Sequence, residues 1–314
     1  MHMIIEALLL DALLGEPRGI PHPVEVIGRL IDFLDKKLWS QSGARLRGLL
    51  LCVCVLAVTG GFVLVLLEVC ALIGPWVRYA AELYLLYAAL AFRSLRDESL
   101  KVYAALSAGD LTAARRSLSY IVGRDTEQLD EKDVVRGCVE TIAEGYVDGI
   151  VSPLFWMAVG ACFGQAPLCA WLFKASSTMD SMIGYDDARY HDLGWAAAKL
   201  DDLLNFIPAR LGGLLAVAAG GLAGCDARAG LRIFLRDRLK HKSPNSAHGE
   251  SAFAGLLGIR LGGGAYYGGV FEPRPSLGDG NREPEAADIL RSHKIMTFAT
   301  ALCVAVVYLG GLLL

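Results

Sequence analysis

Long uncharged runs constrain this chain more than any other feature of its sequence. Leu49 to Leu67 is a run of nineteen residues without a charge, and Ile295 to Leu314 is another of twenty. A helix of about twenty apolar residues matches the thickness of a bilayer core, and backbone inside lipid must satisfy its hydrogen bonds internally. The mean hydropathy of +0.43 fits this reading. The sequence predicts an all-α integral membrane protein with about five transmembrane or re-entrant helical segments.

The other apolar segments carry weaker signals. Trp76 to Phe92 contains Arg78 and Glu82, which are four residues apart and are expected to pair on one helix face. Gly149 to Phe173 is uncharged over 25 residues, but prolines interrupt it, so it predicts either a full span or a re-entrant hairpin. Leu211 to Gly224 is a further apolar segment.

Polar regions at 15–48, 93–148, 174–203 and 225–294 separate the apolar segments. We expect all of them to belong to one polytopic membrane domain covering residues 1–314. Basic residues concentrate in the first, second and fourth regions, which favours the cytoplasmic side for these three. We expect residues 174–203 to reach a cavity open to the cytoplasm as well. The net charge of −3 provides no basic field for nucleic acid, which is not an expected partner.

Apolar periodicity predicts several helices within the polar regions. After a proline-rich loop at 15–23, residues 24–38 should form one helix. Residues 93–121 should form a helical hairpin broken at Gly109, with Asp110 as the N-cap of its second helix. Asp130 should cap the helix that follows, with Asp133 placed as in a capping box.

That helix carries five charged residues at four-residue spacing, so they form one polar stripe. They are Lys132, Arg136, Glu140, Glu144 and Asp148. Successive acids repel one another, and a bound divalent cation would relieve this repulsion through oxygen ligands. We favour contact with a metal or substrate over the alternative, a face that is merely solvated.

A second polar cluster directly follows the 25-residue uncharged run. Lys174, Asp180 and five hydroxyl groups lie within twelve residues that end at Tyr185. Ionisable residues beside a membrane core are costly, and this makes them functional candidates. The alternative is an ordinary solvated loop.

Six stretches together match one family in order along nearly the whole chain. They are I-P-H-P-V-E-V-I-G-R-L-I at 20–31, V-G-R-D-T at 122–126, E-T-I-A-E-G-Y-V-D-G-I-V-S-P-L-F at 140–155, K-A-S-S-T-M-D-S-M-I-G-Y at 174–185, D-D-L-L-N-F-I-P-A-R-L at 201–211 and S-P-N-S-A-H at 243–248. On these motifs the chain resembles the adenosylcobinamide-phosphate synthases of cobalamin biosynthesis, the CobD/CbiB family. It departs from the family pattern at Gly145 and Ser177, where Asn is common, and at Glu16, where Asp is usual.

The resemblance implies a multi-pass ligase of the inner cell membrane whose active site faces the cytoplasm. Such an enzyme joins (R)-1-aminopropan-2-ol, or its O-phosphate, to the propionate of adenosylcobyric acid, using ATP and Mg2+. The product is adenosylcobinamide or its phosphate. The expected partners are these small molecules, the lipid bilayer and other membrane-bound cobalamin enzymes.

This chemistry suggests roles for the matching residues, because phosphoryl transfer needs a metal held by oxygen ligands and cations on the phosphates. We expect catalytic roles for Lys174, Glu144, Asp148 and Asp180, and metal binding by Glu140, Glu144, Asp148 and Asp180. We expect substrate or phosphate contacts from His22, Arg124, Ser181, Arg210, Asn245 and His248. Asp201 and Asp202 are further acid candidates. These remote segments should meet in one magnesium–nucleotide pocket.

Two other classes stay open at this point. A membrane-embedded, Mg-dependent prenyl- or phospho-group transferase would also use spaced acids, together with a long apolar tunnel. A small transporter or membrane sensor is the non-enzymatic alternative. Transporters place ionisable groups inside spans joined by short loops, whereas more than half of this chain lies in the polar regions.

Overall fold

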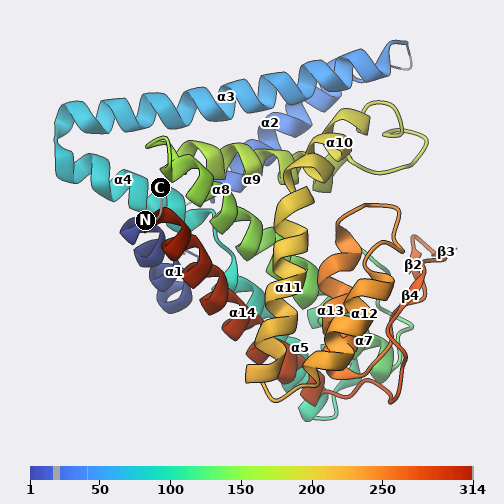
Figure 1. Ribbon diagram of the computed structural model, residues 1–314. Coiled ribbons are helices and arrows are strands. Elements are labelled where there is room, and N and C mark those ends of the chain that lie inside the picture. The colour runs from blue at the N-terminus through green and yellow to red at the C-terminus, as the bar shows by residue number, and fades with distance from the viewer. Residues whose placement is uncertain (17–21, 41, 313–314) are drawn as a thin grey trace. The chain divides into compact units, whose positions relative to one another are not determined.

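The computed structural model describes residues 1–16, 22–40 and 42–312 of the chain, and helices dominate it (Figure 1). The predicted proline-rich loop at 15–23 lies largely outside the described residues. The chain divides into two compact units, each built from separate stretches of sequence. Unit 1 comprises Met1–Ala91, Ser152–Asn205 and Val307–Leu314, and unit 2 comprises Phe92–Val151 and Phe206–Val306. Each unit is described by itself, and the expected single membrane domain stays a prediction.

Helix α9 is the centre of unit 1. The helices of this unit are α1 (His2–Leu14), α2 (Pro23–Leu38), α3 (Ala44–Ile73), α4 (Pro75–Ala88), α8 (Ser152–Ala161), α9 (Ala166–Ile183) and α10 (Trp195–Leu204). Helices α2, α3, α4, α8 and α10 all pack on α9. Buried Trp171 anchors it to α4, because its indole Nε1 donates a hydrogen bond to the Leu85 carbonyl at 2.9 Å. The predicted helix at 24–38 is confirmed as α2.

The uncharged run from Gly149 to Phe173 does not form one span. Helix α8 ends at Ala161, and α9 begins at Ala166 with Pro167 in its first turn and packs back on α8. A helix of ten residues rises only about 15 Å, roughly half of a bilayer core. The hairpin alternative therefore describes this segment, because a turn and a helix-starting proline replace the middle of the predicted span.

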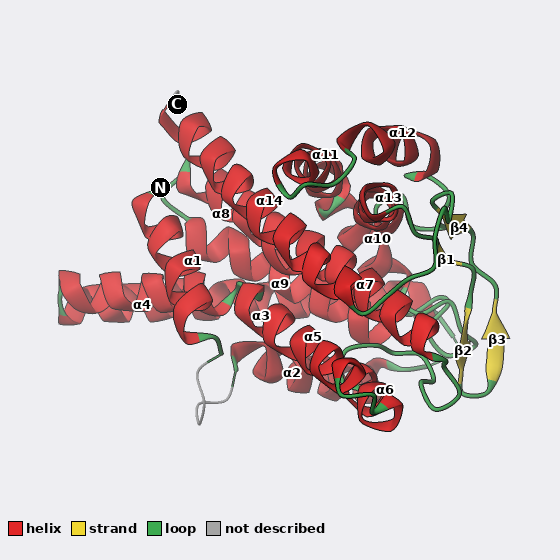
Figure 2. Cartoon of the chain, turned by 90° about the horizontal axis from the view of Figure 1, so that it is seen from below, coloured by secondary structure: helices red, strands yellow, loops and turns green. Residues whose placement is uncertain are grey.

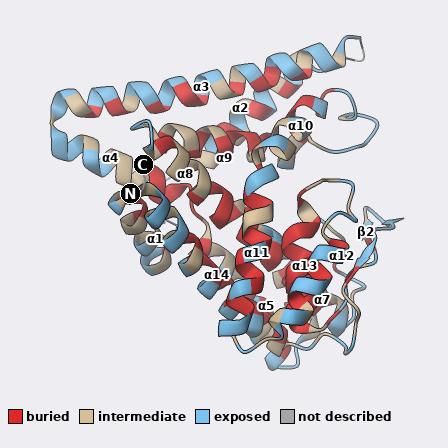
Figure 3. Cartoon of the chain, viewed as in Figure 1, coloured by how far each residue is buried: buried red, intermediate tan, exposed pale blue. Residues whose placement is uncertain are grey.

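Two helices within the described part of the chain are long and apolar enough to cross a membrane, α3 and α14 (Ala287–Leu312). The number becomes three if α10 and α11 (Phe206–Leu222) count as one broken span. About five spans are thus not confirmed. Helix α4 has only 14 residues, but its predicted ion pair is confirmed, with Arg78 Nε 2.9 Å from Glu82 Oε1. Helix α3 exposes large apolar side chains such as Phe62 along its length, as a lipid-facing helix does (Figure 3).

Helix α13 is the buried centre of unit 2 (Figure 3). The unit contains α5 (Phe92–Ser107), α6 (Leu111–Ser119), α7 (Glu131–Tyr146), the π-helical turn η1 (Val147–Val151), α11, α12 (Ala227–Asp237), α13 (Ser246–Leu257) and most of α14. Helices α7, α11 and α12 pack on α13. Both predicted caps are confirmed: Asp110 accepts from Ala113 N, and Asp130 accepts from Asp133 N, each at 2.8 Å.

Two short antiparallel ladders follow α13 and qualify the all-α prediction (Figure 2). Strand β1 (Leu261–Gly262) pairs with β4 (Ser276–Leu277), and β2 (Ala265–Tyr267) pairs with β3 (Val270–Glu272). The β2–β3 turn is Gly268-Gly269, and both glycines have positive φ, at 55° and 80°. A two-residue hairpin turn of type I′, whose twist matches that of the flanking strands, has positive φ at both central residues. This hairpin forms one wall of the pocket described below.

Candidate functional site

Glu140 is the centre of a carboxylate–arginine cluster in unit 2, formed by Glu140, Glu144, Glu250, Arg124 and Arg136, of which Glu140 and Glu250 are buried. Its side chain is 7% exposed, and its Oε2 lies 2.5 Å from Arg124 Nη2. Its Oε1 accepts a hydrogen bond from Gly262 N at 2.7 Å and lies 3.9 Å from Arg136 Nε. A buried carboxylate is stable only with such partners. Helix α7, the 122–126 segment and strand β1 therefore meet at this one side chain.

The two other carboxylates of the cluster titrate unusually. Burial raises the pKa of Glu250 well above its ordinary value, and the nearby Glu140 and Glu144 raise it further, against Arg274 and Arg124. Dense surrounding protein also raises the pKa of Glu144, although that side chain keeps exposed surface. Arg274 opposes this shift and Glu140 adds to it. These shifts favour proton retention by Glu144 and Glu250, and perturbed pKa values of this kind cluster at functional sites.

Asp148 lies beyond the end of α7, in the π-helical turn η1. The backbone changes there from α-helical to π-helical winding, directly after Tyr146. A π-turn has i→i+5 hydrogen bonds, and single π-turns inside helices occur frequently at functional sites. Glu140 and Glu144 share the α7 face, and the continuation of the stripe to Asp148 stays a prediction.

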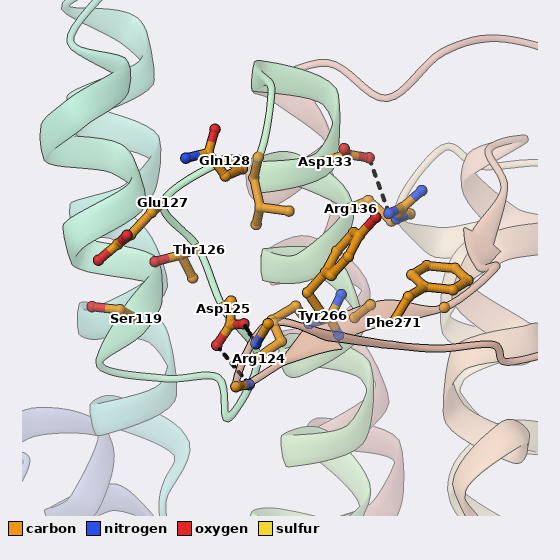
Figure 4. Close-up of a pocket in the computed structure, with 15 residues that line it drawn as sticks. Ser119, Arg124, Asp125, Thr126, Glu127, Gln128, Asp133, Arg136, Tyr266 and Phe271 are labelled. Atoms are coloured by element: carbon orange, nitrogen blue, oxygen red, sulfur yellow. Dashed lines mark hydrogen bonds and ion pairs between the residues drawn. The ribbon is translucent and has the colours of Figure 1, made fainter.

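A pocket of about 860 Å3 lies beside the cluster, between the 119–129 segment, α7 and the β2–β3 hairpin (Figure 4). Arg124 and Arg136 line both the pocket and the cluster. Asp125 attaches the segment to the hairpin: its carboxylate accepts from Gly268 N at 3.1 Å and Gly269 N at 2.7 Å. Its own N donates to the Tyr266 carbonyl at 2.8 Å. The V-G-R-D-T motif therefore acts as a clamp that shapes this pocket.

Arg210, Asn245 and His248, three predicted substrate residues, come together elsewhere in unit 2. Arg210 Nη1 donates to Asn245 Oδ1 at 3.3 Å, and His248 Nδ1 lies 3.2 Å from the Asn245 carbonyl oxygen. His248 is fully buried and packs edge-on against the Phe234 ring. Burial, together with Arg210, lowers the pKa of His248 to about 4, so its imidazole is neutral at pH 7. It packs in the core here, and its predicted substrate role stays a prediction.

Helix α9 of unit 1 carries the second predicted cluster. Lys174, Ser177, Thr178 and Ser181 lie at helical spacing and form one face of α9, which we call the hydroxyl face. Asp180, six residues after Lys174, lies on a different face of the helix. Its Oδ1 stands 2.0 Å from the place that a Cβ on Gly184 would take. Any side chain at position 184 would therefore collide with the carboxylate of Asp180.

His22 is the N-cap of α2, and its Nδ1 accepts a hydrogen bond from Val24 N at 3.3 Å. Burial lowers the pKa of His22; Glu16 opposes the shift, and Lys174 lowers it further. Unit 1 thus brings His22 within electrostatic reach of Lys174. Asp201 accepts from Asn205 Nδ2 at 2.9 Å, and Asp202 lies 3.4 Å from Lys199 Nζ, so both bond within α10 and its C-cap.

The predicted site residues divide between the two units. Lys174, Asp180, Ser181, His22 and the acid candidates Asp201 and Asp202 belong to unit 1, and the others belong to unit 2. No three metal-type side chains within the described ranges lie in a metal-binding arrangement. The oxygens of Glu140 are already held by Arg124 and Gly262. Metal binding by Glu140, Glu144, Asp148 and Asp180, and the single pocket uniting all these segments, stay predictions.

Sequence reasoning missed Glu250, His241 and Arg274. His241 Nδ1 lies 3.9 Å from Glu250 Oε1, and Arg274 acts electrostatically on both Glu144 and Glu250. A signal for Glu250 existed, since it is the only Asp, Glu, Lys or Arg in the twelve residues of α13. A lone acid in a glycine- and alanine-rich buried helix needs a partner. The partners of Glu250 come from distant segments, which composition does not reveal.

Comparison with known proteins identifies relatives along nearly the whole chain. The family model described as "CobD/Cbib protein" matches residues 4–296. A protein of Pelobacter propionicus named "Cobalamin biosynthesis protein CobD" is 45% identical over 305 residues, 97% of this chain and 93% of the relative. Proteins with the same name from Clostridium perfringens and Yersinia enterocolitica are 40% and 42% identical, covering 94% and 98% of this chain and 93% and 96% of the relatives. No solved structure matches the chain significantly.

Proposed function

The chain belongs to the CobD/CbiB family of cobalamin biosynthesis proteins, and from this we propose that it is an ATP-dependent amide ligase. In this proposal it joins (R)-1-aminopropan-2-ol, or its O-phosphate, to the propionate of adenosylcobyric acid. It would work as a multi-pass protein of the inner cell membrane with its site facing the cytoplasm. The two long apolar helices α3 and α14 are compatible with that location.

The carboxylate–arginine cluster is the observation that supports this chemistry best. A carboxylate becomes an acyl donor when its oxygen attacks the γ-phosphorus of ATP and ADP leaves, giving an acyl phosphate. The amine nitrogen then attacks the acyl carbon, phosphate leaves, and the amine loses a proton. A carboxylate with a raised pKa accepts such a proton more readily than one with an ordinary pKa. Glu144 combines a raised pKa with exposed surface, so we assign it this role.

Arginine and lysine supply the positive charge that phosphoryl transfer requires. Arg124 presents a planar guanidinium that is suited to two phosphate oxygens, and Glu140 holds it in place. Lys174 provides a point charge on the hydroxyl face of α9. Mg2+, when bound, would neutralise charge on the β- and γ-phosphates. Asp148 offers the hard oxygen ligand that this ion prefers, and we propose it as one of its holders.

The test compares three variants of the full-length protein in detergent or proteoliposomes: Glu144→Gln, Lys174→Ala and Asp180→Asn. We expect amide formation from adenosylcobyric acid, aminopropanol phosphate and ATP to fall by about 100-fold or more in each. Asp32→Asn is the matched control, because Asp32 is exposed and pairs with Lys36 within its own helix, and it should retain activity. A wild-type protein that forms no amide but transfers prenyl groups from prenyl diphosphates would contradict the proposal.

A further inference from the structure

We propose that the pocket beside the β2–β3 hairpin is the nucleotide subsite, with the base against Tyr266 and Phe271 and the triphosphate toward Arg124 and Arg136. This inference rests on the proposed function, because it decides which of the three substrates this pocket binds. It adds the base-binding residues, which lie in a segment that carries none of the catalytic candidates.

Two aromatic rings form the hairpin side of the pocket. Tyr266 and Phe271 are paired across β2 and β3, and their ring centroids lie 5.2 Å apart. They are 52% and 49% exposed, although both line the concave pocket (Figure 4). Every nucleobase has a flat π-face that stacks on such rings. The hairpin therefore offers a stacking platform inside a pocket.

Two guanidinium groups lie where the pocket meets the carboxylate–arginine cluster. Arg124 and Arg136 both line the pocket, and they lie 2.5 Å and 3.9 Å from the carboxylate oxygens of Glu140. The buried Nε of Arg136 has no hydrogen-bond partner among the described residues. A planar fork of donors matches phosphate oxygens. When the base of a nucleotide stacks on the hairpin, its phosphate chain therefore extends toward Arg124 and Arg136, at the side of the pocket that borders the carboxylate–arginine cluster.

The acidic side chains of the pocket fit this orientation. Asp125 is occupied by the amides of Gly268 and Gly269, and Asp133 pairs with Arg136 at 3.0 Å. Glu127 is exposed and lines the pocket on the 119–129 segment. A carboxylate in this position suits the ribose hydroxyl groups, as acidic residues do in dinucleotide sites. A phosphate that binds Arg136 therefore displaces Asp133, and Arg124 shares its guanidinium between Glu140 and the phosphate.

Size and chemistry favour the nucleotide over the other two substrates. A volume of about 860 Å3 lies within the range of about 300–1,000 Å3 typical of pockets for drug-sized ligands. Aminopropanol phosphate is far smaller and has no ring to stack. Adenosylcobyric acid carries a whole corrin macrocycle with amide arms and an adenosyl group, and it exceeds a drug-sized ligand.

Binding of the non-hydrolysable nucleotide AMP-PNP with Mg2+ to the full-length protein in detergent, measured by calorimetry, tests the subsite. The double variant Tyr266→Ala/Phe271→Ala loses the rings on which the base stacks. We expect its affinity for AMP-PNP to fall about 10- to 100-fold. Tyr266→Phe keeps the ring and should bind as the wild type does. Val270→Ala is the matched control, because Val270 is an exposed apolar residue of the same hairpin that does not line the pocket.

Nucleotide binding and amide formation are measured separately, so failure of the subsite can be distinguished from failure of the proposed function. A wild-type protein that binds the nucleotide through these rings but forms no amide would remove the proposed function and leave the subsite. An active double variant that retains nucleotide affinity within twofold would overturn the subsite and leave the ligase. In an active protein, we expect the double variant to raise the KM for ATP and leave the KM for aminopropanol phosphate unchanged. A raised KM for adenosylcobyric acid alone would assign the pocket to the corrinoid.

Discussion

The two polar clusters of this protein are held together in opposite ways. On the hydroxyl face of unit 1, Thr178 Oγ1 donates to the Lys174 carbonyl at 2.7 Å, and Ser181 Oγ donates to the Ser177 carbonyl at 2.9 Å. Both bonds stay within one helix. In unit 2, Glu140 accepts from Gly262, 122 residues further along the chain. The hydroxyls of Thr178 and Ser181 are bonded locally, whereas the contacts of Glu140 with Arg124 and Gly262 exist only in the tertiary fold.

Because of this difference, we expect substitutions in the two clusters to affect stability and activity differently. A long-range buried pair exists only in the folded state, so its loss leaves a charge buried without a partner. A hydroxyl that bonds its own helix loses little when it is removed, because the backbone carbonyl already accepts the helical bond. We therefore expect substitutions in the carboxylate–arginine cluster to affect folding and activity together. Substitutions on the hydroxyl face should affect activity alone.

Removal of Arg124 should produce the largest effect. Arg124→Met leaves Glu140 buried without its closest cation, and breaking a buried pair costs about 3–5 kcal/mol. Hydrogen exchange followed by mass spectrometry should show this loss in peptides of α7 and α13. Arg116→Met is the control, because Arg116 is exposed and donates to Tyr120 on the same helix end. If the two variants show equal protection in unit 2, the cluster does not support the fold.

The pH dependence of stability should show the role of the carboxylate–arginine cluster in a second way, with a smaller effect than the removal of Arg124. The pKa of Glu250 is raised in the folded protein, so unfolding releases a proton above its ordinary pKa. The contribution of Glu250 to stability is then greatest at low pH, and it is lost as pH rises toward the folded pKa. We expect Glu250→Gln to weaken the decline of the thermal midpoint between pH 5 and pH 8, and thus to gain most at pH 8.

Glu272→Gln, at an exposed position on β3, serves as the control for this titration. It should keep the wild-type slope. A Glu250→Gln variant with an unchanged slope would show that Glu250 is ionised in the folded protein throughout this range.

The accuracy of the sequence predictions follows the same division between local and long-range interactions. Asp110, Asp130 and the Arg78–Glu82 pair were predictable, because each partner lies within four residues. Glu250 was missed, since its charged neighbours come from other segments of unit 2. The π-turn at Asp148 was not predicted either, since residue spacing alone does not reveal a local change of helical winding.

The smallest expected effect compares one substitution at two sites. Ser181→Ala removes a hydroxyl that bonds only within α9, and we expect a change in stability below about 0.5 kcal/mol. Ser99→Ala removes a buried hydroxyl of unit 2 whose Oγ lies 2.7 Å from His293 Nε2, 194 residues away. That leaves a buried polar nitrogen without its partner, which costs about 1–3 kcal/mol.

Chemical denaturation in a fixed detergent measures both variants on one scale. Because the two substitutions delete the same atom, side-chain entropy and helix propensity nearly cancel between them. The difference between the two losses of unfolding free energy then reports whether the deleted hydrogen bond was local or long-range. Ser181 is also a predicted substrate residue, so its variant should lose activity while it keeps its stability. Equal stability losses at positions 181 and 99 would mean that the Ser181 hydroxyl makes interactions beyond its own helix. The hydroxyl face would then be as fixed by the fold as the carboxylate–arginine cluster.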